Sequence, residues 1–342
     1  MDIKVLGIDL AKNVFQLCAI NRAGKQLFNR QIRRAKLAST IAQLEPTFIA
    51  MEACASSHYW GRRFEAMGHQ VALIPAQHVK AFVRVNKSDA HDALAIAEAS
   101  QRPNLKTVPV KSIEQQDLQM ISRQRQRWIR HRTAVANQIR DTAREYGVIM
   151  PVGYRALKNA LPSVLEDAEN ELTIIARELI AEWMDELRQL DTKIHSAQER
   201  QKRMVSDNPV SQSLQEVPGF GPVVSAVVLS AVGNASQFAN GRQMAAWMGL
   251  VPRHTGTGGR TRMLGISKNG DRELRTMMIN GARAVIRWID RRDDPLGRWV
   301  KQLEARRGRN KAVVALAKKL TRVAWALIAK GERFDINKAF SG

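Results

Sequence analysis

Two aspartates stand three residues apart in the segment KSDAHDALAIAEA, at residues 87–99. The chain carries a formal net charge of +22, so acids are scarce and a pair of them is unusual. One aspartate could cap a helix or offset its dipole, but that role leaves the second unexplained. Residues three apart in a helix lie about 5–6 Å apart on one face. Asp89 and Asp92 could therefore bind one cation together.

Two further acids follow apolar runs typical of buried strands. Asp9 ends the run in LGIDLAK, and Glu52 ends the run in FIAMEAC. If these strands are neighbours, four carboxylates converge on a site suited to hard cations such as Mg²⁺. Two such ions about 3.5–4 Å apart stabilise the attacking and leaving oxygens of a phosphodiester displacement. The alternative is that the acids are solvated or cap helices.

Composition favours a nucleic-acid-binding protein. Lys and Arg number 54 against 32 Asp and Glu, which gives a surface that attracts polyanions. No apolar stretch reaches the roughly 18 residues of a membrane span, and no signal-peptide pattern is present. Cys18 and Cys54 show no zinc-ligand spacing, so any metal is expected to have oxygen ligands. We expect a cytoplasmic protein with no membrane partner.

The pattern of apolar residues predicts an α/β domain over residues 1–105. Two β-type runs flank a turn at residues 11–13, and a third run follows, as in a meander. Strands at 47–54 and 70–76 then alternate with helices. This order predicts a mixed sheet covered by helices.

Long helices are expected next. One covers residues 112–145 and carries Arg123, Arg127 and Arg130, which either bind a phosphate backbone or form a solvated face. A second follows Pro162, and its apolar residues from 165 to 197 recur at three- and four-residue spacing. That spacing predicts a short coiled coil with a stutter, and hence a partner helix.

The remaining residues form a basic, mainly helical region. Gly219 and Gly221 stand before an apolar helix, the pattern of a helix-hairpin-helix whose backbone N–H groups can bind a phosphate. A plain glycine-containing turn is the alternative. Between residues 253 and 333, 21 Lys and Arg face 7 Asp and Glu, so this region is the main candidate polyanion surface.

Six motifs in order resemble the DEDD-type insertion-sequence transposases, the family of bridge-RNA-guided recombinases. They are GIDLAKN, AMEAC, NKSDAHDALAIAEA, VPGFGP, AAWMGLVPR and TGTGGRTRMLGISKNGDRELR. The resemblance implies a RuvC-like catalytic domain of the ribonuclease H fold at 1–105. It also implies a long-helix and coiled-coil segment at 106–208 and a C-terminal transposase domain at 209–342.

The resemblance also implies a site and partners. The family's acidic tetrad binds Mg²⁺ and corresponds to Asp9, Glu52, Asp89 and Asp92. The expected partners are donor and target DNA, a structured non-coding bridge RNA that pairs with both, and further copies of the chain in a dimer or tetramer. The expected location is the bacterial cytoplasm, at the nucleoid.

Family members use a loop serine as the nucleophile that becomes covalently linked to DNA. The corresponding segment here, RHTGTGGRTR, contains no serine. Thr257 aligns with the family position and carries the same hydroxyl with an added methyl, and Thr255 is the nearby alternative. Either the Thr257 hydroxyl is the nucleophile or Thr257 is an ordinary loop residue. Around it, we expect Arg260, Arg262 and Lys268 to hold phosphates.

The sequence therefore predicts an RNA-guided DNA recombinase that cleaves and rejoins strands through a protein–DNA ester. One alternative is a junction nuclease whose carboxylates activate water through a metal ion. The other is a nucleic-acid-binding protein without catalysis, in which the acids are structural.

Overall fold

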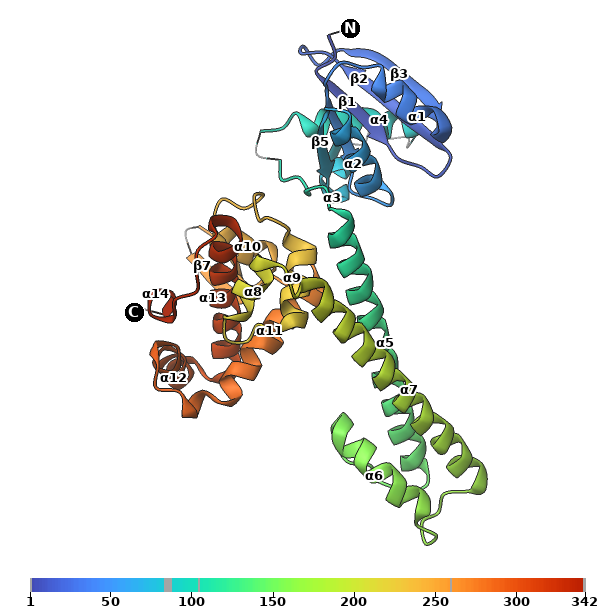
Figure 1. Cartoon of the computed structure of the whole chain (residues 1–342), viewed down its shortest axis with the longest axis vertical. Helices are drawn as coiled ribbons and strands as arrows, with labels where there is room; N and C mark the ends of the chain where they lie inside the picture. The colour runs from blue at the N-terminus through green and yellow to red at the C-terminus, as the bar shows by residue number, and fades with distance from the viewer. Residues whose placement is uncertain (1, 83–87, 104, 259, 341–342) are drawn as a thin grey trace. The chain divides into compact units, whose positions relative to one another are not determined.

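A computed structural model describes residues 2–82, 88–103, 105–258 and 260–340 (Figure 1). The chain divides into two compact units, Met1–Ile113 and Glu114–Gly342. The predicted three-part division, with boundaries after residues 105 and 208, stays a prediction. Among the described residues, no helix has the length and apolar character needed to cross a bilayer.

The first unit contains a five-stranded mixed sheet with the order β3-β2-β1-β4-β5. Its strands are β1 (Val5–Asp9), β2 (Val14–Ile20), β3 (Gln26–Arg33), β4 (Phe48–Glu52) and β5 (Gln70–Ile74). The first three strands pair antiparallel, whereas β4 is parallel to both β1 and β5. The predicted meander and mixed sheet are confirmed.

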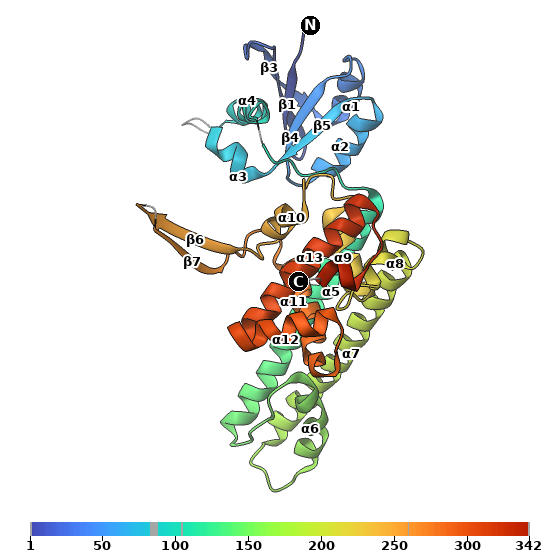
Figure 2. The ribbon, with the colours of Figure 1, turned by 90° about the vertical axis from the view of Figure 1, so that its left-hand side faces the viewer.

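Helices cover both faces of this sheet (Figure 2). They are α1 (Arg34–Ala42), α2 (Ser57–Ala66), the short α3 (Ala76–Val79) with a 3₁₀ turn at Lys80–Phe82, and α4 (Asp89–Ser100). Leu6 and Ile8 pack on the face that α1 and α2 cover. Val5 and Cys18 pack on the face that α4 covers. Each β1 residue thus faces the opposite way from the next, as alternation in a strand requires.

In the part of the second unit that the structure describes, the regular elements are helices and one β-hairpin, formed by β6 (Pro252–Thr257) and β7 (Arg260–Ile266). Its helices are α5 (Ile113–Glu145), α6 (Tyr154–Glu166), α7 (Ile174–Val205), α8 (Pro209–Gln215), α9 (Pro222–Val232), α10 (Gly241–Trp247), α11 (Arg272–Arg287), α12 (Pro295–Arg307), α13 (Arg309–Lys330) and α14 (Ile336–Phe340), with a 3₁₀ turn at Ile289–Arg291. The predicted long helix over residues 112–145 is confirmed.

Helices α5 and α7 form an antiparallel pair. Gln201 donates to Ser122 at 2.7 Å, and Arg132 forms an ion pair with Asp191 at 2.8 Å. Residues further along α5 therefore contact residues closer to the start of α7, as in an antiparallel pair. Buried side chains from α5, α6 and α7 form a core under one end of the pair.

The predicted long helix after Pro162 corresponds to α7, but its predicted start is wrong. Pro162 lies inside α6, and α7 begins only at Ile174. The Arg177 guanidinium donates to the carbonyl of Leu165, in the last turn of α6, at 2.8 Å and to that of Asp167, just after α6, at 2.7 Å. These bonds satisfy the backbone of a break that the spacing of apolar residues does not reveal.

The predicted apolar seam differs from the buried face of α7 only in the first part of the helix. The seam positions Ile175 and Leu179 are 69% and 39% exposed, whereas the later seam positions Leu187 and Leu190 are buried as predicted. Leu172 precedes α7 and is buried against its own chain. Within the chain, α7 packs against α5. Ile175 and Leu179 are the large apolar seam residues of α7 that stay exposed and are available to contact a second copy of the chain.

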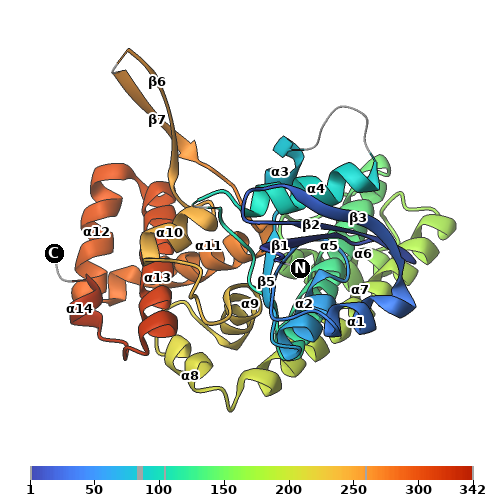
Figure 3. The same cartoon turned by 90° about the horizontal axis from the view of Figure 1, so that it is seen from above.

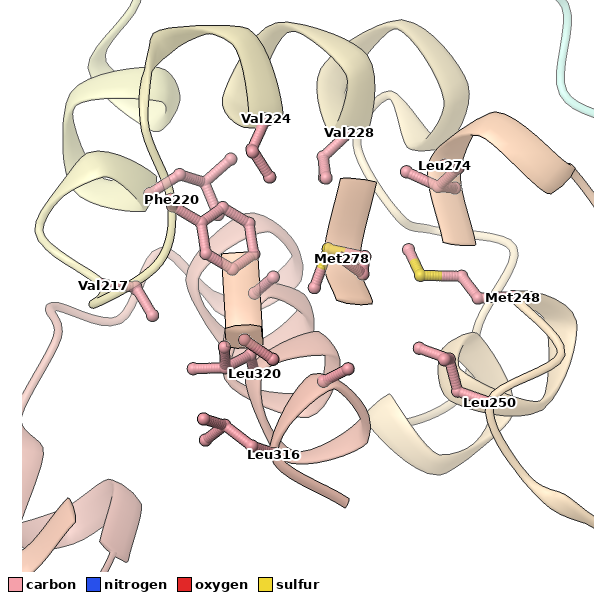
Figure 4. Close-up of a cluster of buried hydrophobic side chains, with 14 of the residues drawn as sticks. Val217, Phe220, Val224, Val228, Met248, Leu250, Leu274, Met278, Leu316 and Leu320 are labelled. Carbon is pink, nitrogen blue, oxygen red and sulfur yellow. The ribbon is translucent and has the colours of Figure 1, made fainter. Parts of the chain in front are cut away.

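A larger core holds the rest of the second unit together. In Figure 4, Phe220 and Val224, from the turn before α9 and from α9, approach Leu320 of α13 and Met278 of α11. Met248, at the end of α10, belongs to the same core. This core fixes the base from which the β6–β7 hairpin leaves.

Candidate active site and nucleic-acid surface

Asp9 and Glu52 end two adjacent parallel strands. Because β1 and β4 pair in parallel with Ile8 opposite Met51, both acids follow at the same edge of the sheet. Alternation places Asp9 on the face of Val5, and Glu52 on the face of the buried Ala50, which is the face that α4 covers. Sequence and pairing thus bring these two carboxylates to one edge and one face.

Helix α4 lies unusually close to β1. A Cβ atom on Gly7 would stand 2.4 Å from the carbonyl oxygen of Ala93, so only glycine fits there. At the other end, the Lys4 ammonium donates to the Gln101 side chain at 3.4 Å. The helix therefore runs against the direction of β1, and its first turn, with Asp89 and Asp92, lies toward the end of the strand that carries Asp9.

The start of α4 is fixed by neutral side chains. Ser88 is the N-cap and accepts from the backbone N–H of His91, so capping does not account for Asp89 or Asp92. Asn29 of β3 donates to the carbonyl of Ala90 at 2.9 Å. Gln16 in turn donates to the Asn29 side chain at 2.5 Å.

These bonds tie the helix to the sheet beside the candidate acids. Gln16 is the strand partner of Asp9, so the side chains of Gln16 and Asn29 link the end of β1 to the first turn of α4. Both residues were missed by the sequence analysis. The sequence signal for Gln16 is a polar residue inside the apolar run VFQLCAI, and the structure shows that its side chain is buried.

The carboxylates at this edge affect the pKa of the neighbouring Cys54. Burial, followed by the charges of Glu52 and Asp9, raises the pKa of the Cys54 thiol to about 11. Both carboxylates therefore act on one group from nearby. Yet within the described part of the chain, no three His, Cys, Asp or Glu residues lie close enough together to hold one ion. Carboxylate oxygens are donors of the kind that a hard divalent cation takes, and a shared site formed by Asp9, Glu52, Asp89 and Asp92 stays a prediction.

Thr257 is the last residue of strand β6. The glycines around it had suggested a flexible loop instead. Thr257 pairs with Arg260 of β7, and Thr255 pairs with Arg262. Strand β7 begins three residues after the end of β6, and Gly258 has φ +57°, as short hairpin turns favour. Figures 2 and 3 show the hairpin projecting away from the helices of its unit.

The base of the hairpin is locked by backbone packing. A Cβ on Gly249 would stand 2.4 Å from the carbonyl oxygen of Asn269, and Gly249 has φ +72°. The buried Arg275 donates to the carbonyls of Met248 and Asn269, at 3.3 and 2.7 Å. Lys268 is exposed at this base with φ +58°. Much of the motif AAWMGLVPR…GISKNGDRELR therefore serves to hold the hairpin.

The arginines of α5 line a hollow of about 850 Å³ between α5 and α7. Arg123, Arg127 and Arg130 are all exposed, and Lys193 and Arg200 of α7 line the same hollow. The two α7 residues were missed because the sequence does not state which helix pairs with α5.

The candidate helix-hairpin-helix glycines differ in role. A Cβ on Gly219 would stand 2.7 Å from the carbonyl oxygen of Gly281 in α11, and Gly219 has φ +92°. Gly219 is therefore required by packing within the unit. Gly221 is the N-cap of α9, with no atom near its missing side chain. A phosphate at this turn stays a prediction.

Comparison with known proteins places the chain among DNA-rearranging enzymes. Residues 6–148 match the DEDD transposase family of the IS110 type, and residues 211–296 match the family described as Transposase IS116/IS110/IS902. These matches define the class, a transposase. The chain belongs to the IS116/IS110/IS902 family of transposases, enzymes that cleave and join DNA.

Relatives match over nearly the whole chain. A probable family 20 transposase of Pseudomonas aeruginosa is 43% identical over 96% of this chain and 98% of its own length. The transposase for insertion sequence element IS1111A of Coxiella burnetii is 40% identical over 97% of this chain and 92% of its own length. A pilin gene-inverting protein of Moraxella bovis is 23% identical over 96% of this chain and 97% of its own length. The resemblance inferred from the motifs is confirmed.

Proposed function

We propose that the chain is an RNA-guided recombinase that mobilises an insertion sequence in the bacterial nucleoid, with a ribonuclease H-like first unit. The observation that carries the catalytic part is the placement of Asp9 and Glu52 at the ends of adjacent parallel strands, on the face that α4 covers. The excess of basic residues in the second unit supports binding of donor DNA, target DNA and a structured guide RNA.

In this proposal, Asp9 and Glu52 bind Mg²⁺, and Asp89 and Asp92 complete the ligand set from α4. Bound Mg²⁺ would stabilise charge on the oxygens of the reacting phosphodiester. The α4 acids must approach the sheet edge to share such ions, and the Gln16–Asn29 link sets how far the first turn stands from it.

The hydroxyl of Thr257 is the proposed nucleophile. Its oxygen would bond to a backbone phosphorus and lose its proton, while one DNA oxygen leaves and takes up a proton. The resulting ester retains the phosphodiester for rejoining, which reverses the same step. Arg260 and Arg262, opposite Thr257 and Thr255 in the hairpin, would offset charge on the phosphate, and Lys268 would hold the backbone at the hairpin base.

A trapped protein–DNA adduct tests the nucleophile. Thr257→Ala should abolish an adduct that survives denaturant, whereas Thr257→Ser should keep it because the hydroxyl remains. An unchanged adduct in Thr257→Ala assigns the role elsewhere, with Thr255 the next residue to test. Cleavage with no adduct in the wild-type protein would favour the nuclease alternative.

The carboxylates and the guide require separate tests. Asp89→Asn or Asp92→Asn should abolish cleavage and leave DNA affinity unchanged or higher, because the basic surface is intact. Equal loss of binding and cleavage would argue against a metal site. Sequencing the RNA that copurifies with the protein should give one structured species, and a random mixture would refute guidance by RNA.

A further inference from the structure

The hollow between α5 and α7 lies between two hydrophobic cores. The core under α5, α6 and α7 extends along α7 as far as Leu190, and the larger core of the second unit includes α7 again only at Val205. The pair Ser122–Gln201 and the ion pair of Arg132 with Asp191 bridge the helices at either end of this stretch. The helices are thus held together while the space beside them, about 850 Å³, is left open.

The rim of the hollow carries positive charge only. Twelve residues line it, and none of them is acidic, whereas five are cations: Arg123, Arg127, Arg130, Lys193 and Arg200. Glu273 of α11 interacts electrostatically with Arg123 and Arg130, but it does not line the hollow. Five exposed cations with no acid among them favour an anion with several charges.

Apolar surface lies beside the cations. Met120 is 61% exposed in the hollow. Trp128 is half-buried, packed on one side against the core of α5, α6 and α7. A core-supported indole next to arginines is a surface on which a nucleic-acid base can stack, worth about 1–3 kcal/mol per base.

We propose that this hollow binds one unpaired nucleotide, with its base on Trp128 and Met120 and its flanking phosphates on the basic rim. A base within a duplex is stacked on its neighbours and cannot enter, so the site selects a bulged, looped or flipped nucleotide. A stacking energy of about 1–3 kcal/mol corresponds to a preference of roughly 5- to 150-fold over a fully paired strand. This site lies outside the proposed catalytic residues and does not require them.

The test compares two 20-base-pair duplexes, one fully paired and one with a single bulged 2-aminopurine. Affinities are measured for the full-length wild-type protein, with DNA and RNA versions of each. We expect tighter binding of the bulged duplex by at least about fivefold, with a change in the probe's fluorescence. The version with the larger preference identifies the nucleic acid that supplies the nucleotide. Equal affinities for bulged and paired forms in both versions would overturn the proposal.

Blocking the hollow separates the base from the charges. Ser196 is exposed and lines the hollow, so Ser196→Trp should fill it, abolish the preference for the bulge and leave affinity for paired duplex unchanged. Ser206→Trp, at the exposed end of α7 and outside the hollow, is the matched control and should behave as wild type. A preference that persists in Ser196→Trp shows that the base lies elsewhere.

Two further variants keep the outcome decisive. If Ser196→Trp does not fold, Met120→Glu places an acid in the hollow at an exposed position and should likewise remove the preference. Asp92→Asn should retain the full preference even if it abolishes cleavage. Loss of the preference in Asp92→Asn would refute the independence of the two sites, whereas wild-type cleavage by Asp92→Asn would contradict only the proposed catalytic role.

Discussion

Replacing Gly7 by alanine should displace α4 without touching any proposed catalytic side chain. The new Cβ would stand 2.4 Å from the Ala93 carbonyl oxygen and 2.9 Å from the Ala97 Cβ. Ordinary van der Waals contact begins near 3.4 Å, so the helix must retreat by about 1 Å. The obstacle is backbone, and rotation of a side chain cannot relieve it.

The expected stability cost of Gly7→Ala is that of overpacking, about 1–3 kcal/mol. The expected effect on activity is larger, because a misplacement of about 1 Å can lower a rate on the order of 100-fold. Recombination of the element's ends in cells, scored at the rejoined junction, measures activity. The melting temperature of the purified protein and its DNA affinity measure folding and binding.

Ala19→Val is the matched control for Gly7→Ala. Ala19 is fully buried on the face that α1 and α2 cover, so added methyl groups there should cost similar stability without moving α4. We expect Ala19→Val to recombine at nearly the wild-type rate at temperatures where it is folded. If Gly7→Ala loses stability and still recombines normally, the position of α4 does not control the chemistry.

Three further predictions concern the second unit. Burial alone would raise the pKa of Asp191, but hydrogen bonds led by that from Lys158 hold it below its usual value. Asp191→Asn should therefore lower the melting temperature at pH 7, and the difference from wild type should shrink below about pH 4 as the carboxyl protonates; a constant difference would contradict this. Ile175→Asp with Leu179→Asp should lower the oligomeric mass by light scattering, and an unchanged mass would exclude this face from assembly. Arg275→Met should cost about 1–3 kcal/mol in denaturant unfolding because the carbonyls of Met248 and Asn269 lose the guanidinium donor, and wild-type stability would show that the hairpin base does not need it.

The sheet could be predicted from the sequence because its strands are short apolar runs separated by polar turns. The sequence could state only that the acids would converge if β1 and β4 were neighbours. The structure shows that β1 and β4 are adjacent and parallel. The link through Gln16 and Asn29 could not be predicted, since it joins residues on different strands through side chains.

The helical region was harder to predict, because apolar spacing records a buried face without naming what covers it. The same spacing fits a second copy of the chain and the intramolecular partner α5 equally well. The break before α7 depends on bonds from Arg177 to backbone carbonyls, which leave no periodic signal. The six motifs identified the family because their order is specific, even though much of the sixth holds a hairpin base.

The hairpin that carries Thr257 has consequences for how such proteins change over evolution. Its strands pair with each other and with no other strand among the described residues, so its length is not tied to the core. Successive residues on a strand lie on opposite faces. If each strand is lengthened by one residue, the residues at the tip move to the opposite face of the hairpin. Lengthening each strand by two restores the original face. We expect insertions and deletions between Val251 and Ser267 to be retained in pairs on each strand, and a library of such variants selected for recombination would reveal that parity.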